Sequence, residues 1–156
     1  MAWIDQLIVL PVTDLTSIMV LYREYLPFVP EPFINMAGPT EPPLLIKQAP
    51  GNWWANHTTT LFDASAQVTA IFSELADADI AILSPIIGYC AFTAASMNLY
   101  LAAFPWVDPA SSQKIDAAAL SQKNLDWLRN FARVCPLGRH WVCKILIPHP
   151  AAPPHD

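Results

Sequence analysis

The stretch SPIIGYCAFTAASMNLYLAAFP, residues 84–105, decides the fold. Ser84 is a favoured residue for capping the start of a helix, and Pro85 is favoured at the first helical position. The residues that follow are apolar nearly all round, which is typical of a helix buried on most sides. The sequence therefore predicts a central buried helix over residues 85–104. The small residues where neighbouring helices should approach this helix closely are Gly88, Ala91, Ala95 and Ala102.

The rest of the chain shows helical periodicity and no alternating strands. Further helices are expected from Thr13 or Asp14 to Pro27, over about 60–76, over about 112–132, and around Trp141 and Ile145. A Pro-rich connector is expected over residues 27–57, because residues 27–50 hold seven of the sixteen prolines. The sequence thus predicts an all-α fold of four to five helices around the central one.

The composition limits the classes of function. Hydrophobic residues make up 54% of the chain and charged residues only 13%, about half the usual share of charge. We therefore expect either many buried helices or a surface that needs a partner. The eight Lys and Arg residues are scattered singly, and the net charge is -5, so no basic stripe for nucleic acid is present. Three cysteines, an odd number, argue against a disulfide framework and for a reducing compartment.

An alternative interpretation concerns residues 80–107, which contain no charged residue. A run of that length can span a bilayer, so the chain could be a small membrane-associated protein that uses this segment. Polar residues, prolines and small side chains interrupt the run, which favours a buried core helix over a membrane segment.

No sequence pattern of a catalytic site is present: GxSxG, HExxH, GxGxxG and the P-loop are all absent. We therefore expect no enzymatic activity and no catalytic residue. Cys135, His140 and Cys143 form C-x4-H-x2-C, a spacing that matches no common zinc ligand pair. We expect no metal ligand and no cofactor in this chain. The N-terminal residues lack a basic region and carry Asp5, which is untypical of a signal peptide.

Two groups of residues are candidates for a partner or effector surface. Arg23 and Glu24 stand in MVLYREYLPF, residues 19–28, off the apolar stripe of that helix, which is typical of a solvated helix face. Trp53 and Trp54 stand in the expected connector. Adjacent tryptophans in a connector either anchor it to the core or line a ligand pocket or partner groove. The sequence leaves both roles open.

Several segments occur in an order that is typical of one protein family. Their sequences are VLYREYLPF (20–28), VPEP (29–32), GPTEPP (38–43), LFDASAQVTAIFSEL (61–75), SPIIGYCAFTAASMNLYLAAFPWVDP (84–109) and NLDWLRNFARVCPLGRHWV (124–142). Together they resemble the C-terminal half of the regulatory, or middle homology, region of fungal Zn2Cys6 binuclear-cluster transcription factors. The similarity covers about residues 13–145, and the order of the segments carries it.

The resemblance implies a partial regulatory domain over residues 1–147. The Pro-rich composition of residues 148–156 predicts a disordered tail. It implies a nuclear protein that controls transcription through intramolecular contacts, through another protein or through a small-molecule effector. Without the resemblance, a cytoplasmic location is expected. The partner that it implies is the missing N-terminal half of the regulatory region, which would pack on the first helix.

The resemblance also limits what this chain does alone. The DNA-binding module of the family needs six cysteines in CxxC-type pairs and a basic stretch, whereas this chain has three cysteines, none of them so spaced. We therefore expect no DNA binding by the chain itself, and zinc only in the missing DNA-binding domain. The residues expected at an effector or partner surface are Arg23, Glu24, Trp53, Trp54 and Tyr89.

Overall fold

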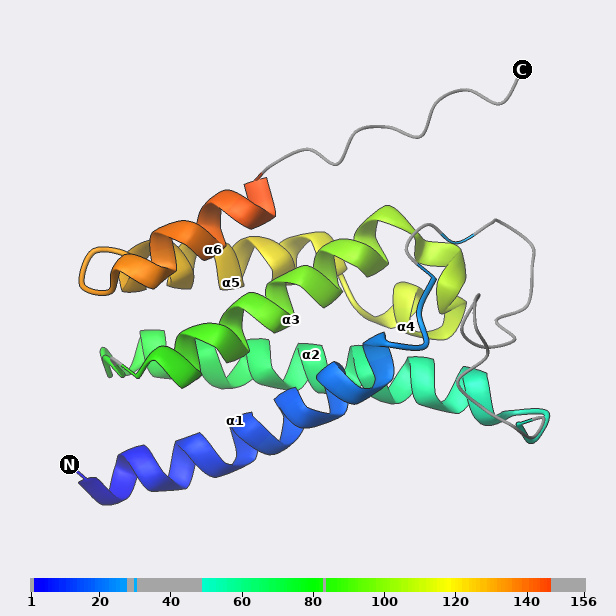
Figure 1. Cartoon of the computed structure of the whole chain (residues 1–156), viewed down its shortest axis with the longest axis horizontal. Helices are drawn as coiled ribbons and strands as arrows, with labels where there is room; N and C mark the ends of the chain where they lie inside the picture. The colour runs from blue at the N-terminus through cyan, green and yellow to red at the C-terminus, as the bar shows by residue number, and fades with distance from the viewer. Residues whose placement is uncertain (1, 28–29, 31–48, 83, 147–156) are drawn as a thin grey trace.

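The computed structural model describes residues 2–27, 30, 49–82 and 84–146 (Figure 1). All regular elements in this part of the chain are helices, so the predicted all-α fold is confirmed. In chain order the elements are α1 (Ala2–Arg23), α2 (Trp53–Asp77), α3 (Pro85–Ala103), the 3-10 helix η1 (Pro105–Val107), α4 (Pro109–Lys114), α5 (Ala117–Phe131) and α6 (Pro136–Leu146).

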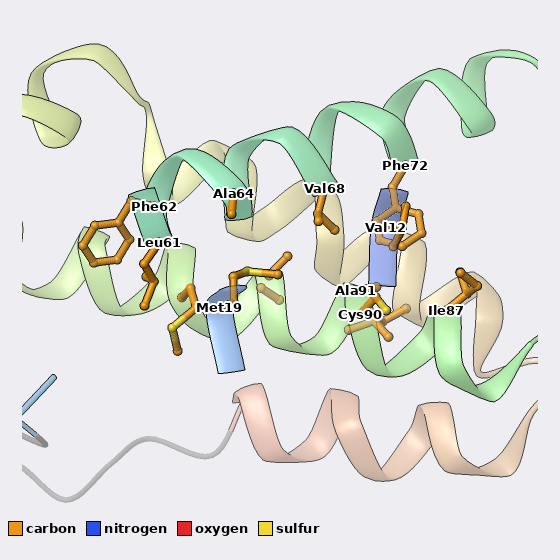
Figure 2. Packing of buried hydrophobic residues seen from close by; sticks show 14 of the residues in the cluster. Val12, Met19, Leu61, Phe62, Ala64, Val68, Phe72, Ile87, Cys90 and Ala91 are labelled. Atoms are coloured by element: carbon orange, nitrogen blue, oxygen red, sulfur yellow. The ribbon is translucent and has the colours of Figure 1, made fainter. Parts of the chain in front are cut away.

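The central helix of the bundle is α3. Figure 1 shows it between α1 and α2 on one side and α5 and α6 on the other, and it contacts all four. Ten of its nineteen residues are buried, which confirms the predicted central helix. Figure 2 shows the core that it shares with α2 and α1, in which Val12 of α1, Phe72 of α2 and Ile87 of α3 belong to one cluster of buried residues. Among the described helices, α3 alone is long and apolar enough to cross a membrane.

The start of α3 follows the sequence closely. Ser84 is the extended N-cap residue and Pro85 occupies the first helical position, although the Ser84 side chain makes no capping hydrogen bond. The expected small-residue face is buried at Gly88, Ala91 and Ala95, but Ala102 is exposed. The Ser121 hydroxyl, in the second turn of α5, donates a hydrogen bond to the Ala95 carbonyl (3.2 Å). Since α5 begins only one turn before Ser121, it does not extend far enough to cover Ala102.

The first helix begins much earlier than the sequence predicted. The expected cap at Thr13 or Asp14 is wrong, because α1 starts at Ala2 and contains Pro11 in its interior. The Thr13 hydroxyl donates back to the Val9 carbonyl (2.7 Å) instead of capping a helix start. Val12 is fully buried, and burial of this apolar turn outweighs the cost of a proline, which removes one backbone hydrogen bond.

Two other helix boundaries differ from the expectation. The helix α2 begins at Trp53, so the last five residues of the expected connector over 27–57 are helical. The helix expected over 112–132 is divided into α4 and α5. The division lies at Asp116, whose carboxylate accepts from the Ala119 amide (3.1 Å) and caps α5. A side-chain acceptor at this position satisfies a backbone donor that a helix start leaves free.

The last expected helix is confirmed as α6, which carries Trp141 and Ile145 packed against the core. Two expectations lie outside the described residues: the course of the connector over 31–48 and the disordered tail over 148–156.

Candidate functional site

The Arg23–Glu24 pair lies at the end of α1. The Arg23 Nε atom is 3.4 Å from Glu24 Oε1, and the two side chains are 38% and 62% exposed. The structure therefore places both residues at the surface of this chain, as expected for a solvated pair. Exposed ion pairs of this kind contribute only about 0–1 kcal/mol to folding, so the stability of the chain gives little reason for their presence.

An aromatic cluster joins the end of α1 to the start of α2. The Trp53 ring stacks on His57 with centroids 3.8 Å apart, and the Tyr22 ring meets His57 edge-on at 4.5 Å. Tyr25 contacts both Trp53 and Trp54, with ring centroids 5.2 and 5.5 Å apart. Because the Trp53 carbonyl can only accept, His57 Nδ1 carries a proton and donates to it (2.6 Å). The two tryptophans thus join the start of α2 to the end of α1.

The chain just after α1 is also fixed to α3. The Tyr100 hydroxyl donates a hydrogen bond of 2.7 Å to the Pro27 carbonyl, and the Tyr100 ring packs edge-on against Phe104 at 5.0 Å. Burial raises the pKa of Tyr100 to about 12, because the phenolate would lose hydration that the neutral phenol does not need. This contact was not predicted, since its partners are 73 residues apart in the chain.

The five residues expected at one surface do not come together. Four of them, Arg23, Glu24, Trp53 and Trp54, lie at the junction of α1 and α2. Tyr89 lies in the second turn of α3, with its ring 6.4 Å from that of Phe92. Figure 1 shows the start of α3 and the start of α2 at opposite ends of the bundle. Tyr89 therefore belongs to a different surface.

The outer face of α1 carries large apolar side chains in contact with solvent. Leu10 and Leu21 are each 64% exposed. Their separation of eleven residues is about three helical turns, so both lie on one face of α1. Asp14 and Ser17, between them on that face, are exposed too. This set of Leu10, Asp14, Ser17 and Leu21 is called the outer α1 face below. Leu10 was not singled out in the sequence because it precedes the predicted helix start.

A buried polar network links α2, α3 and α5. The Asn98 amide nitrogen (3.1 Å) and the Asn124 amide nitrogen (2.7 Å) both donate to the Thr69 hydroxyl. The Thr69 hydroxyl in turn donates to the Ser65 carbonyl (2.8 Å). The Ser65 hydroxyl lies 2.8 Å from Asn98 Oδ1. Sequence reasoning missed this network, because its members come from three helices and stand among apolar residues.

One atom of the network has no hydrogen-bond partner among the described residues: the buried Asn124 Oδ1. The other polar atoms of the network are paired, so the network fixes the lateral positions of the three helices. A buried network that is nearly complete specifies one packing arrangement more strongly than apolar contacts do. We interpret the network as structural, since Asn98 and Asn124 are fully buried and out of reach of a ligand in solvent.

The described residues hold no group of three or more His, Cys, Asp or Glu side chains close enough to bind a metal ion. Cys135 is half-buried and Cys143 is exposed, and both are free thiols. Cys90 is buried in the core, and this burial raises the pKa of its thiol, an effect that a hydrogen bond to Thr16 opposes. A thiol with a raised pKa is a poor nucleophile at neutral pH.

Comparison with known proteins identifies no relative: no family model, no curated protein and no solved structure matches this chain.

Proposed function

We propose that this chain is a non-enzymatic regulatory domain of the fungal transcription-factor type. In this proposal it controls transcription in the nucleus through protein contacts and does not bind DNA by itself. The partner is the N-terminal half of the same regulatory region or another protein that takes its place. The outer α1 face is the docking surface, and the Arg23–Glu24 pair lies at the end of the same helix.

The observation that carries the proposal is the exposure of Leu10 and Leu21, each 64% in contact with solvent, on one face of α1. Solvated apolar surface is unfavourable by about 25 cal/mol per Å², so a partner that covers Leu10 and Leu21 gains free energy by removing them from water. The ordered family-like segments of the sequence supply the identity of the partner. A small-molecule effector would bind at the aromatic cluster next to this face, where Trp53 and Trp54 report on it by their fluorescence.

A tethering experiment tests the proposal. The full chain is fused to an unrelated DNA-binding domain in a fungal cell, and transcription of a reporter is measured. We expect the fusion to change transcription relative to the DNA-binding domain alone. The double variant Leu10→Glu/Leu21→Glu should abolish that change, because two carboxylates on the outer α1 face oppose apolar docking.

The matched control introduces a glutamate on another helix. Gln67 is exposed on α2, and the Gln67→Glu variant should behave like the unmodified fusion. An unmodified fusion without any effect on the reporter, or variants that all act alike, would contradict the proposal. Circular dichroism of each purified variant shows whether the bundle is intact.

The alternative proposal is a membrane-associated protein that uses residues 80–107. The length and apolar character of α3 favour it. The burial of Asn98 and Thr93 in the same helix argues against it, because α3 would have to leave its hydrogen-bonded neighbours to enter lipid. Extraction of cell membranes with alkaline carbonate separates the two proposals. A chain that stays in the membrane pellet supports this alternative, and a chain that is released supports the regulatory domain.

A further inference from the structure

The charges of this chain are segregated in space although they are scattered in sequence. Five of the eight Lys and Arg residues lie in residues 117–146, which form α5, α6 and the turn between them. The end of α2 carries negative charge. Its last turn contains Glu74 and Asp77, Asp79 follows two residues later, and all three side chains are exposed. No basic residue lies in that turn.

The acidic set of Glu74, Asp77 and Asp79 is unfavourable for its own helix. The C-terminal end of a helix carries a partial negative charge, so carboxylates there reduce helix stability. Among the described residues none of the three forms an ion pair, because the two ion pairs found are Arg23–Glu24 and Arg129–Asp126. The negative charge at this end is therefore uncompensated by an ion pair within the described part of the chain.

A basic set lies at the same end of the bundle. Arg133 and Arg139 are exposed at the turn between α5 and α6. Figure 1 shows this turn and the α2–α3 connection at the same end. The beginning of α3 also lies close to α5 and α6. A Cβ atom at Gly88 in α3 would stand 2.5 Å from the Trp141 ring of α6 and 2.7 Å from the Phe131 ring of α5.

Apolar side chains are exposed next to both charged sets. Ile80 follows α2 and is 37% exposed, and Ile86 in the first turn of α3 is 57% exposed. On the side of the α5–α6 turn, Val134 and Leu137 are 60% and 51% exposed. An apolar centre with charges at its edges is the usual composition of a protein interface.

We propose that this end of the bundle is a surface through which two copies of the chain associate. A two-fold axis through the apolar residues places the acidic set of each copy against the basic set of the other, so the surface is self-complementary. A partner of one charge sign would instead meet like charge on half of the surface. The inference is independent of the proposed function, which uses the outer α1 face.

The dimer should depend on concentration and salt. The net charge of each chain is -5, so two copies repel one another overall, and the local charge pairs direct their approach. Salt screens exposed pairs of this kind. We expect sedimentation velocity of the full chain to show a monomer–dimer equilibrium that shifts toward monomer at high salt.

Charge reversal gives the decisive test. One variant reverses the basic set (Arg133→Glu/Arg139→Glu), and a second reverses the acidic set (Glu74→Lys/Asp77→Lys/Asp79→Lys). Each alone should bring like charges together and raise the dimer Kd by about tenfold or more. Mixed in equal amounts, the two variants should associate with each other. Both sets of the first variant are then acidic and both sets of the second are basic, so opposite charges meet at each contact.

The matched control is Asp63→Lys/Lys114→Glu, which reverses exposed charges away from this end and should leave the dimer unchanged. Circular dichroism shows that each variant is folded. The proposal is overturned by a wild-type chain that is monomeric at all concentrations, by reversed variants that dimerise as the wild type does, or by a mixture that fails to associate. Association of the wild type only with a different protein would also overturn it.

Discussion

Gly88 lets α3 lie directly against Trp141 of α6. A Cβ atom at position 88 would stand 2.5 Å from Cζ3 of Trp141, closer than nonbonded carbon atoms approach. The Gly88→Ala variant should therefore destabilise the bundle by about 1–3 kcal/mol, because the buried ring of Phe131 on the other side leaves little space for adjustment. Denaturant unfolding followed by circular dichroism measures this change.

The control for this prediction is Gly51→Ala. Nothing lies within 4 Å of a Cβ atom at Gly51. The Gly51→Ala variant should therefore be as stable as the wild type, or up to about 1 kcal/mol more stable, because alanine lowers the conformational entropy of the unfolded chain. Equal effects of the two substitutions would show that the contact between α3 and α6 is not as close as described.

Thr69 is the acceptor shared by Asn98 and Asn124, and its replacement should be costly. The Thr69→Val variant keeps the shape but leaves two buried amide nitrogens without their acceptor. We expect a loss of about 2–4 kcal/mol, since each unsatisfied buried group costs about 1–3 kcal/mol. Thr60→Val on the exposed side of α2 is the matched control, because Thr60 only donates to its own helix (2.8 Å). A loss as small as that of the control would mean that water reaches the network.

The Tyr100 hydroxyl should give the stability a specific dependence on alkaline pH. Its pKa is raised to about 12 in the folded chain, from about 10 in the unfolded chain. Between these values the unfolded chain releases the proton and the folded chain keeps it, so stability falls as pH rises from about 10 to about 12.

The Tyr100→Phe variant isolates this effect. At neutral pH it should lose about 0.5–1.5 kcal/mol through the missing bond to the Pro27 carbonyl. Above pH 10 its deficit relative to the wild type should shrink, because the variant has no phenol at this position to titrate. The free energy of unfolding of both chains, measured from pH 8 to pH 11, checks the prediction. A constant deficit would argue against a buried hydroxyl.

Asp79 ends α2 in a left-handed conformation, with φ 54. The Ile80 amide bonds to the Leu75 carbonyl (2.9 Å) and the Asp79 amide to the Ala76 carbonyl (3.1 Å), which is the Schellman arrangement in which glycine is preferred. Asp79→Gly should therefore stabilise the chain by about 0.5–1 kcal/mol, since residues with a Cβ atom are strained there. Asp79→Asn separates the effect of charge from that of the backbone.

The control for Asp79 lies two residues earlier. Asp77 is the last residue of α2, so Asp77→Gly should not stabilise the chain as Asp79→Gly does, because the low helix propensity of glycine offsets the removal of a carboxylate from the helix end. Thermal unfolding of the variants compares them directly. A destabilised Asp79→Gly chain would contradict the proposed strain at this position.

The sequence alone determined the helical class, the central helix and the start of α3. These features depend on local chemistry: Pro85 suits the first helical position, and the apolar residues of α3 leave it no stable place except the core. The start of α6 at Pro136 was not predicted, because Pro136 was interpreted as a break in the chain. The helix over about 60–76 was predicted from its helical periodicity, and Leu61, Val68 and Phe72 form part of its buried face.

Only the tertiary structure decided the remaining features. Pro11 is helical because Val12 packs in the core, and α2 starts at Trp53 because its ring stacks on His57. Of the candidate surface residues, four lie together and Tyr89 lies apart, because α2 and α3 run in opposite directions. The polar network and the segregation of charge depend on residues far apart in the chain. Local propensity does not encode which of these distant side chains meet, since that is set by how the helices pack.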